Sequence, residues 1–175
     1  MRFLAGLFSF LTLAVLLAAA WFALRPPPMP RPEALTGPVT RIVVEKAARR
    51  MTVYVGDKAA RVWPIALGFT PTGAKDRQGD GRTPEGRFRI DRRNAASAYH
   101  LSLGIDYPRP EDRQRARMAG VSPGGDIFFH GQPNGRPEGE VLAYDWTAGC
   151  IALSDAQIAE LFAATPIGAE VEIRP

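Results

Sequence analysis

The sequence contains very little cysteine: Cys150 is the only one in 175 residues. A chain with one thiol cannot form an internal disulfide, so a disulfide-stapled scaffold is excluded. The absence of a C-x-x-C pair removes the common zinc-ribbon and dithiol motifs. A lone thiol in an oxidising compartment is a liability unless it is buried or used. Cys150 is therefore either a small core residue or a nucleophile.

Histidine is almost as scarce, with only His100 and His130. Together with Cys150 they could supply three zinc ligands and leave a fourth position for water, but no H-x-x-x-H spacing supports this. The run 76–81 begins like an EF-hand calcium loop, yet Arg87 stands where that loop needs a bidentate glutamate. We therefore predict no metal site, and a structural or site-wall position for His100.

Lysine is also rare: three lysines accompany 19 arginines, and the formal net charge is +4. A mildly basic balance favours acidic partners such as nucleic acid, anionic lipid or a carboxylate-bearing polymer. The sequence lacks the clustered basic stripe with interleaved aromatics that is typical of nucleic-acid binders, so we predict no nucleic-acid partner. It also lacks an internal repeat, which excludes solenoids and propellers.

Long hydrophobic runs are confined to Phe3–Leu24, 22 residues without a charge, which could span a bilayer as one helix. The alanines 18–20 offer a signal-peptidase-like site, so residues 1–24 are expected to be an uncleaved membrane anchor or a signal peptide. Residues 25–38 contain six prolines and are predicted to be an extended linker. The remainder, 39–175, is long enough for one exported domain.

The pattern within that domain predicts a mostly β fold, sandwich-like or barrel-like, with one or two short helices. Short runs rich in β-branched residues indicate strands, and the Gly-, Thr- and Pro-rich stretch 68–85 indicates a long loop. A proline start at Pro110 and a capping box at Ser154 indicate the helices. The expected strands are 39–45, 51–55, 61–67, 86–91, 99–105, 126–130 and 171–173, and the first helix is 110–118.

The last third of the chain holds the candidate chemistry. His130 ends a predicted strand before a Gly/Pro-rich loop, and Cys150 follows twenty residues later, directly after Gly149. A thiol becomes nucleophilic when a base lies within hydrogen-bond reach, and a backbone carbonyl can orient that base. Backbone N–H groups around Gly149 and Cys150 could bind a developing oxyanion. The alternative, a buried thiol and a structural histidine, stays open on the residues alone.

The spacing of these residues resembles the signature of the L,D-transpeptidase catalytic domain, also called the YkuD domain. The signature is a histidine, about fourteen to seventeen residues, and then [S/T]-x-G-C-hydrophobic, matched here by His130 and the run Thr147–Ile151. Upstream, Lys75, Gly79–Asp80 and Thr83–Gly86 resemble the family's K…GD…TPxG run. The likeness covers roughly Val39 to Pro175.

The resemblance implies that Cys150 is the nucleophile, that His130 is the general base and that the Gly131 carbonyl orients it. It implies an oxyanion and substrate site formed by Asp145, Trp146, Thr147, Ala148, Gly149 and Ala152. The substrates would be peptidoglycan stem peptides, as acyl donor and acceptor, joined through a thioester without metal or organic cofactor. The domain would act at the periplasmic face of the inner membrane, anchored through residues 3–24, or free in the periplasm, in cell-wall organisation and cell shape.

One position departs from the family pattern. Ala152 stands where Arg or Asn is common, and its methyl group cannot hold a substrate carboxylate bidentately. Ala at this position is similar to a subgroup associated with 1,3-type crosslinks, in which the acyl group comes from the L-Ala of the stem. Two alternatives remain: a hydrolase of the same fold, acting as an L,D-carboxypeptidase or endopeptidase, and a non-catalytic wall-binding module. An intact Cys and His argue against the binding module.

Overall fold

The computed structural model describes residues 15, 17, 19–21, 24, 34–137 and 139–175. Residues 34–175 form one compact unit. Most of the expected export segment and most of the expected linker lie outside the described residues, so the division at residues 24 and 38 stays a prediction. Within the part of the chain that is described, no helix has the length and hydropathy needed to cross a membrane.

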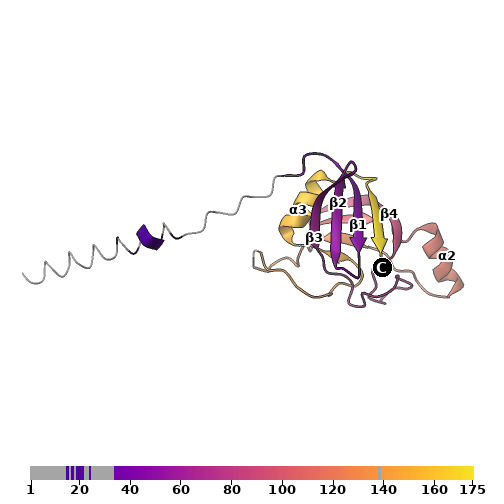
Figure 1. The fold of residues 1–175 in the computed structure, drawn as a ribbon. Helices are drawn as coiled ribbons and strands as arrows, with labels where there is room; N and C mark the ends of the chain where they lie inside the picture. The colour runs from indigo at the N-terminus through magenta and orange to yellow at the C-terminus, as the bar shows by residue number, and fades with distance from the viewer. Residues whose placement is uncertain (1–14, 16, 18, 22–23, 25–33, 138) are drawn as a thin grey trace, which may run out of the picture. The chain divides into compact units, whose positions relative to one another are not determined.

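The compact unit is built on one eight-stranded sheet, which confirms the mostly β prediction (Figure 1). Its strands are β1 (Val39–Glu45), β2 (Arg50–Val55), β3 (Lys58–Pro64), β4 (Gly86–Ser97), β5 (His100–Ile105), β6 (Phe128–His130), β7 (Ile151–Ala152) and β8 (Glu170–Arg174). The spatial order is β3-β2-β1-β8-β4-β5-β6-β7. The C-terminal strand β8 lies between β1, to which it is parallel, and β4, to which it is antiparallel.

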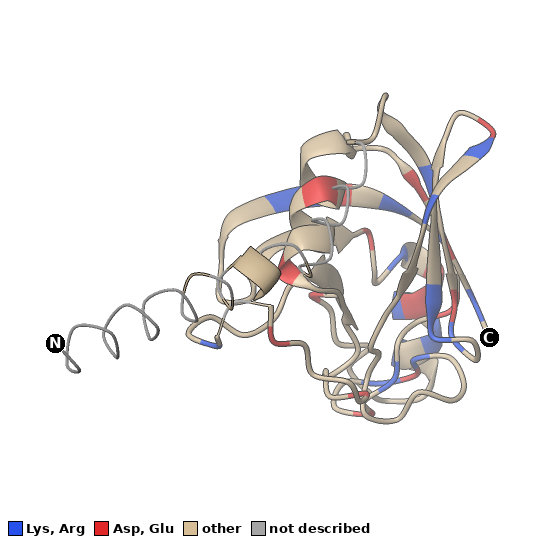
Figure 2. Ribbon diagram, turned by 60° about the vertical axis from the view of Figure 1, so that its left-hand side comes forward, with Lys and Arg blue, Asp and Glu red and all other residues tan. Residues whose placement is uncertain are grey.

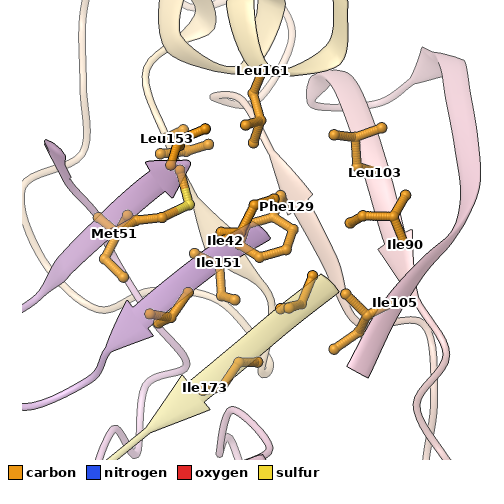
Figure 3. Close-up of a cluster of buried hydrophobic side chains, with 14 of the residues drawn as sticks. Ile42, Met51, Ile90, Leu103, Ile105, Phe129, Ile151, Leu153, Leu161 and Ile173 are labelled. Carbon is orange, nitrogen blue, oxygen red and sulfur yellow. The ribbon is translucent and has the colours of Figure 1, made fainter. Parts of the chain in front are cut away.

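Side chains of the sheet and of one helix meet in a single core. Figure 3 shows Leu161 of the helix directed toward side chains from strands far apart in the sequence, among them Ile42, Phe129 and Ile151. Each of these four side chains is completely buried. Burial on this scale contributes about 1.5–3 kcal/mol per large aliphatic side chain. The core therefore fixes β6 and β7, which carry the candidate chemistry.

Both helices begin where the sequence predicts. α2 (Pro110–Met118) starts at Pro110. α3 (Asp155–Ala164) has Ser154 as its N-cap, with the capping box formed through Gln157. At the other end of α3, Arg93 donates to the Phe162 carbonyl at 2.6 Å and its guanidinium lies 4.0 Å above the Phe162 ring. α3 packs on β5 and β6, so it supports the strand that ends at His130.

The strand boundaries differ from the sequence prediction most clearly at β3 and β4, and one strand was missed. β3 ends at Pro64, because Ile65–Leu67 leave the hairpin and Ala66 pairs instead with Ala152. β4 continues to Ser97 because its second half pairs with β5. The two-residue strand β7 was not predicted, since a strand this short has no periodicity of its own.

Charged residues of both signs lie on the strands of the sheet (Figure 2). Across neighbouring strands Arg41 and Arg89 both stand beside Glu170, and Arg87 stands beside Glu172. Opposite charges on facing positions neutralise each other locally. The excess of arginine therefore does not form a continuous basic stripe on these strands.

Candidate active site

Two short parallel strands bring the predicted nucleophile and base to one edge of the sheet. β6 ends at His130, and β7 begins directly after Cys150. Their register pairs Phe129 with Ile151 and His130 with Ala152. By this register Cys150 stands opposite Phe128, two positions before His130. Side chains two positions apart on a strand share a face, so Cys150 and His130 lie on the same face of neighbouring strands about 4.8 Å apart.

Cys150 and His130 line the same cavity, which has a volume of about 510 Å³. The walls come from β4, β5, β6 and the segment before Cys150. The lining residues are Asn94, Ser97, Ala98, Tyr99, Ser102, Asp126, Phe128, His130, Trp146, Thr147, Ala148 and Cys150. The volume is in the range of small-molecule and peptide side-chain sites.

The Cys150 thiol is held by the strand that leads to His130. Its S–H donates to the carbonyl of Asp126 at 3.3 Å, and the Phe128 N–H donates to Sγ at 3.4 Å. Burial raises the pKa of the thiol above its usual 9.0, the Phe128 N–H opposes that shift, and the negative charge of Asp126 adds to it. The resting group at neutral pH is therefore the thiol, which needs a base to become a nucleophile.

His130 has the arrangement required of that base. The imidazole is 4% exposed, and its Nδ1 lies 2.7 Å from the Gly131 carbonyl. Because a carbonyl only accepts, Nδ1 carries the hydrogen and Nε2 keeps its lone pair. Burial lowers the pKa of His130 below 6.5, opposed by the bond to Gly131. The resting imidazole is therefore neutral and can accept a proton.

Aromatic rings hold the imidazole in place. The His130 ring centroid lies 4.6 Å from that of Tyr99 and 5.4 Å from that of Trp146. The two rings also contact each other at 5.7 Å. The Trp146 Nε1 is buried without a hydrogen-bond partner among the described residues. Trp146 therefore supports the base by packing, and Tyr99 is a wall residue that sequence analysis missed.

Glycine is required directly before the nucleophile. Gly149 has φ +136°, and a Cβ built there would lie 2.6 Å from the Arg82 carbonyl oxygen. The Gly149 N–H donates to Thr147 Oγ1 at 3.1 Å, and that hydroxyl donates to the Cys150 carbonyl at 2.7 Å. The turn that presents Cys150 is thus fixed from both sides. Of the predicted site residues, Thr147, Ala148 and Gly149 all lie in this turn.

Asp145 is held by a partner that no sequence pattern indicates. Arg49, between β1 and β2, donates from Nε at 2.9 Å and from a terminal nitrogen at 2.8 Å to the Asp145 carboxylate. The Leu67 N–H donates to the same carboxylate at 2.8 Å. Arg49 lies 96 positions from Asp145, so no local pattern connects them. This clamp, Arg49 with Asp145 and Leu67, fixes the chain just before Trp146.

Ala152 does not line the cavity of Cys150. It lines a second cavity of about 530 Å³ together with Arg49, Asp145, Gln132 and the segment 141–144. The two cavities share no lining residue. Two positions expected at one substrate site, Asp145 and Ala152, therefore line a different cavity from Cys150. A substrate contact for them stays a prediction.

His100 stands apart from the pair. It begins β5 with φ +62°, its N–H donates to Asn134 at 2.8 Å, and it is not among the residues that line the Cys150 cavity. No group of three or more His, Cys, Asp or Glu side chains suited to a metal is found in the described part of the chain. His100, His130 and Cys150 are accordingly not brought together as a ligand set.

Two buried lysines build the wall behind Gly149. Lys75 is paired with Asp80 at 2.7 Å, with side-chain exposures of 3% and 8%. Lys46 donates to Glu85 at 2.8 Å and to the Thr83 carbonyl at 3.0 Å. Burial alone would raise the pKa of Asp80, but the Lys75 bond and three backbone N–H groups lower it to about 2. The K…GD…TPxG run therefore forms a rigid loop that supports the nucleophile.

Comparison with known proteins agrees with this architecture. The family model for the YkuD L,D-transpeptidase catalytic domain matches residues 39–173. The chain is 26% identical over 133 residues to the candidate L,D-transpeptidase YqjB of Bacillus subtilis (strain 168), covering 75% of this chain and 69% of YqjB.

Solved structures show the same fold. The helical cell shape determining protein Pgp2 from Campylobacter jejuni superposes with a TM-score of 0.59 at 24% identity, covering 82% of this chain and 51% of that one. An L,D-transpeptidase from Xylanimonas cellulosilytica gives a TM-score of 0.52 at 17% identity, covering 89% of this chain and 67% of that one. The chain thus spans about half the length of the Pgp2 chain.

The fold and the site together define a class of protein: a mostly β domain with a cysteine and a histidine in one cavity. The chain belongs to the YkuD family of L,D-transpeptidase catalytic domains, because the family model covers most of it. It is therefore a domain of a peptidoglycan-modifying enzyme family.

Proposed function

We propose that this protein is a peptidoglycan L,D-transpeptidase in which Cys150 carries the acyl group as a thioester. The observation that supports the proposal most strongly is the shared cavity of Cys150 and His130, with His130 Nδ1 bonded to the Gly131 carbonyl. That bond directs the lone pair of Nε2 away from Gly131 and leaves it free to take a proton. A thiol and a neutral imidazole at one site form the usual nucleophile and base of acyl transfer.

The first half of the reaction forms the acyl-enzyme. His130 Nε2 takes the Sγ proton as sulfur attacks the carbonyl on an L-stereocentre of the donor stem. The Gly149 N–H is engaged with Thr147, so we assign the oxyanion to the Cys150 N–H. The C–N bond then breaks, and His130 returns the proton to the departing amine of the next residue.

The second half releases the acyl group. An amine of an acceptor stem attacks the thioester, His130 takes the proton from that amine, and Cys150 leaves as the thiolate that regains it. Water in place of the amine would give the hydrolase, an L,D-carboxypeptidase or endopeptidase. A new amide bond in the product therefore distinguishes transfer from hydrolysis.

We further propose 1,3-type crosslinks, with the acyl group taken from L-Ala and delivered to diaminopimelate. The support is Ala152, whose methyl group supplies no guanidinium for a donor carboxylate. We also propose that the domain acts at the periplasmic face of the inner membrane, anchored through residues 3–24, or free in the periplasm. Muropeptides from expressing cells test the crosslink: a mixture of only 3,3 and 4,3 dimers contradicts the 1,3 assignment.

The activity is tested with purified protein and defined muropeptides, with the products read by mass spectrometry. We expect dimers, loss of activity in Cys150→Ala and after thiol alkylation, and no effect of a chelator. We also expect a covalent adduct with a carbapenem. Activity that survives Cys150→Ala but is lost with the chelator would establish a metal hydrolase. Binding without any product would establish a wall-binding module.

A further inference from the structure

The cavity around Cys150 contains one side chain with a full charge. The pKa of Cys150 is raised and that of His130 is lowered, so both are neutral at pH 7. Asn94, Ser97 and Ser102 add polar but uncharged groups. Among the residues that line this cavity, Asp126 is the one aspartate or glutamate, and no lysine or arginine lines it. Arg92, which contacts Asp126, and Lys75 act on the thiol from outside this lining, so the one charge in the lining itself is negative.

The backbone holds Asp126 beside the nucleophile. Its carbonyl accepts the Cys150 S–H at 3.3 Å, so its main chain touches the reacting sulfur. Its φ is +55°, a conformation that Asp and Asn tolerate better than most other residues. The carboxylate is 90% exposed. Asp126 thus presents an exposed carboxylate at the cavity, while its own backbone carbonyl contacts Sγ.

The carboxylate of Asp126 has free acceptor capacity. Its Oδ1 lies 3.3 Å from a terminal nitrogen of Arg92, a long and exposed contact. Arg92 makes its shorter bond to Asp91, at 3.0 Å, and lies 4.6 Å above the Phe128 ring. Among the described residues nothing donates to Oδ2 of Asp126. A carboxylate accepts at two oxygens, so a ligand donor can bind here while Arg92 stays in place.

We propose that Asp126 binds the primary ammonium of the diamino acid in a peptidoglycan stem peptide at the mouth of the Cys150 cavity. The inference rests on the function proposed above, and it names the group that the site selects. An ammonium donates three hydrogen bonds and matches a carboxylate with two acceptor oxygens. The carboxylates of the same peptide are repelled from Asp126, so one charge orients the peptide. The ammonium can belong to the donor or to the acceptor stem.

Equilibrium binding tests the proposal without turnover. The Cys150→Ala variant is titrated with two tetrapeptides that differ only in the diamino acid, one with its side-chain amine free and one with that amine acetylated. We expect the free amine to bind about fivefold more tightly, the effect of one exposed charge-assisted pair. In Cys150→Ala/Asp126→Asn both peptides should bind alike. Asn keeps the size, the tolerance for positive φ and the carbonyl, and Asp126→Glu should restore part of the preference.

Matched controls separate local from general charge effects. Asp57→Asn removes one exposed carboxylate in the turn between β2 and β3, away from the lining of the Cys150 cavity, and should leave the preference unchanged. Equal affinities for the two peptides in Cys150→Ala, or a preference that survives Asp126→Asn, overturns the proposal. A preference that Asp57→Asn removes equally would assign it to net charge and would also overturn it.

Turnover assays of the wild-type protein and of Asp126→Asn, both with Cys150 intact, then identify whether the ammonium belongs to the donor or to the acceptor. If Asp126→Asn slows formation of the acyl-enzyme, the ammonium is that of the donor; if it raises the KM for the acceptor with kcat unchanged, the ammonium is that of the acceptor. A wild-type protein that forms no acyl-enzyme with either peptide contradicts the proposed function. The binding preference is measured separately, so the two failures are distinguishable.

Discussion

Two loops frame the nucleophile, and they are built differently. The loop behind Gly149, residues 68–85, is fixed by two buried lysines and their carboxylates. The loop ahead of Trp146, residues 131–145, is more exposed: its Arg136–Glu140 pair lies on the surface, and Val141 and Tyr144 are 49% and 63% exposed. The first loop therefore forms a fixed wall, and the turn that carries Cys150 lies against it at the Arg82 carbonyl. The second borders the cavities and is held chiefly by Gln132 and by the Arg49 clamp on Asp145.

The largest difference between the loops is expected in stability. Lys75→Met removes the cation that neutralises Asp80 in a nearly dry site, and breaking a buried pair from one side costs about 3–5 kcal/mol. Arg136→Gln removes one partner of a surface pair and should cost less than about 1 kcal/mol. Urea denaturation of both variants measures the difference. Equal losses would contradict the contrast between a fixed and an exposed loop.

The Asp80 carboxylate also predicts an acid limb of stability. Its pKa is about 2 in the folded protein and near 3.8 when unfolded, so its stabilising contribution is present above pH 3.8 and is lost as the pH falls toward 2. Asp80→Asn should flatten the dependence of the unfolding free energy on pH in that window. Denaturant midpoints between pH 2 and 5 test this expectation, and an unchanged slope would contradict it.

Two glycine substitutions, Gly149→Ala and Gly139→Ala, compare the two regions by their effect on the rate of acylation. Gly149→Ala places a methyl group against the Arg82 carbonyl and must shift the turn that carries Cys150. We expect at least about a hundredfold loss in the rate of acylation, because small displacements of reacting groups have effects of this size. Gly139 also has positive φ, but a Cβ there meets nothing within 4 Å. Gly139→Ala should keep the rate within a factor of a few. Single-turnover mass spectrometry measures both.

The Arg49 clamp should have a smaller effect. Arg49→Gln and Asp145→Asn each loosen the chain before Trp146 without touching Cys150, and we expect about a fivefold loss of kcat with little change in KM. The double variant should lose no more than either single variant, because both remove one interaction. Additive losses in a double-mutant cycle would show that the two residues act separately.

These residues show what the sequence could and could not predict. The Cys150 and His130 assignment came from motif spacing, and α2 and α3 from a proline start and a capping box, all of them local signals. Arg49 and Tyr99 were missed as neighbours of the site because they reach it over long sequence separations. Asp126, in the predicted strand that ends at His130, was missed because its contact with Cys150 depends on the pairing of β6 with the chain before β7. The placement of Ala152 in the second cavity depends on the direction of a two-residue strand, which has no periodicity to read.

The smallest expected effect is a shift in the pH dependence of Cys150 alkylation and of acylation by the stem peptide. Since burial lowers the pKa of His130 and raises that of Cys150, the resting pair is neutral. Alkylation by iodoacetamide should increase with pH with a midpoint above 9.0, the ordinary thiol value. The rate of acylation by stem peptide should fall on the acid side with a midpoint below 6.5, where His130 gains its proton. Reactivity that is flat from pH 5 to 8 would show a preformed thiolate–imidazolium pair instead.

The central claim is that Cys150 carries the acyl group and His130 activates it. Intact mass and peptide mapping after incubation with a donor stem peptide test it directly. The account predicts one adduct per chain, located on the peptide that contains Cys150, absent in Cys150→Ala and formed at least about a hundredfold more slowly in His130→Gln. An adduct on any other residue, or product formed with Cys150 unmodified throughout turnover, would contradict it.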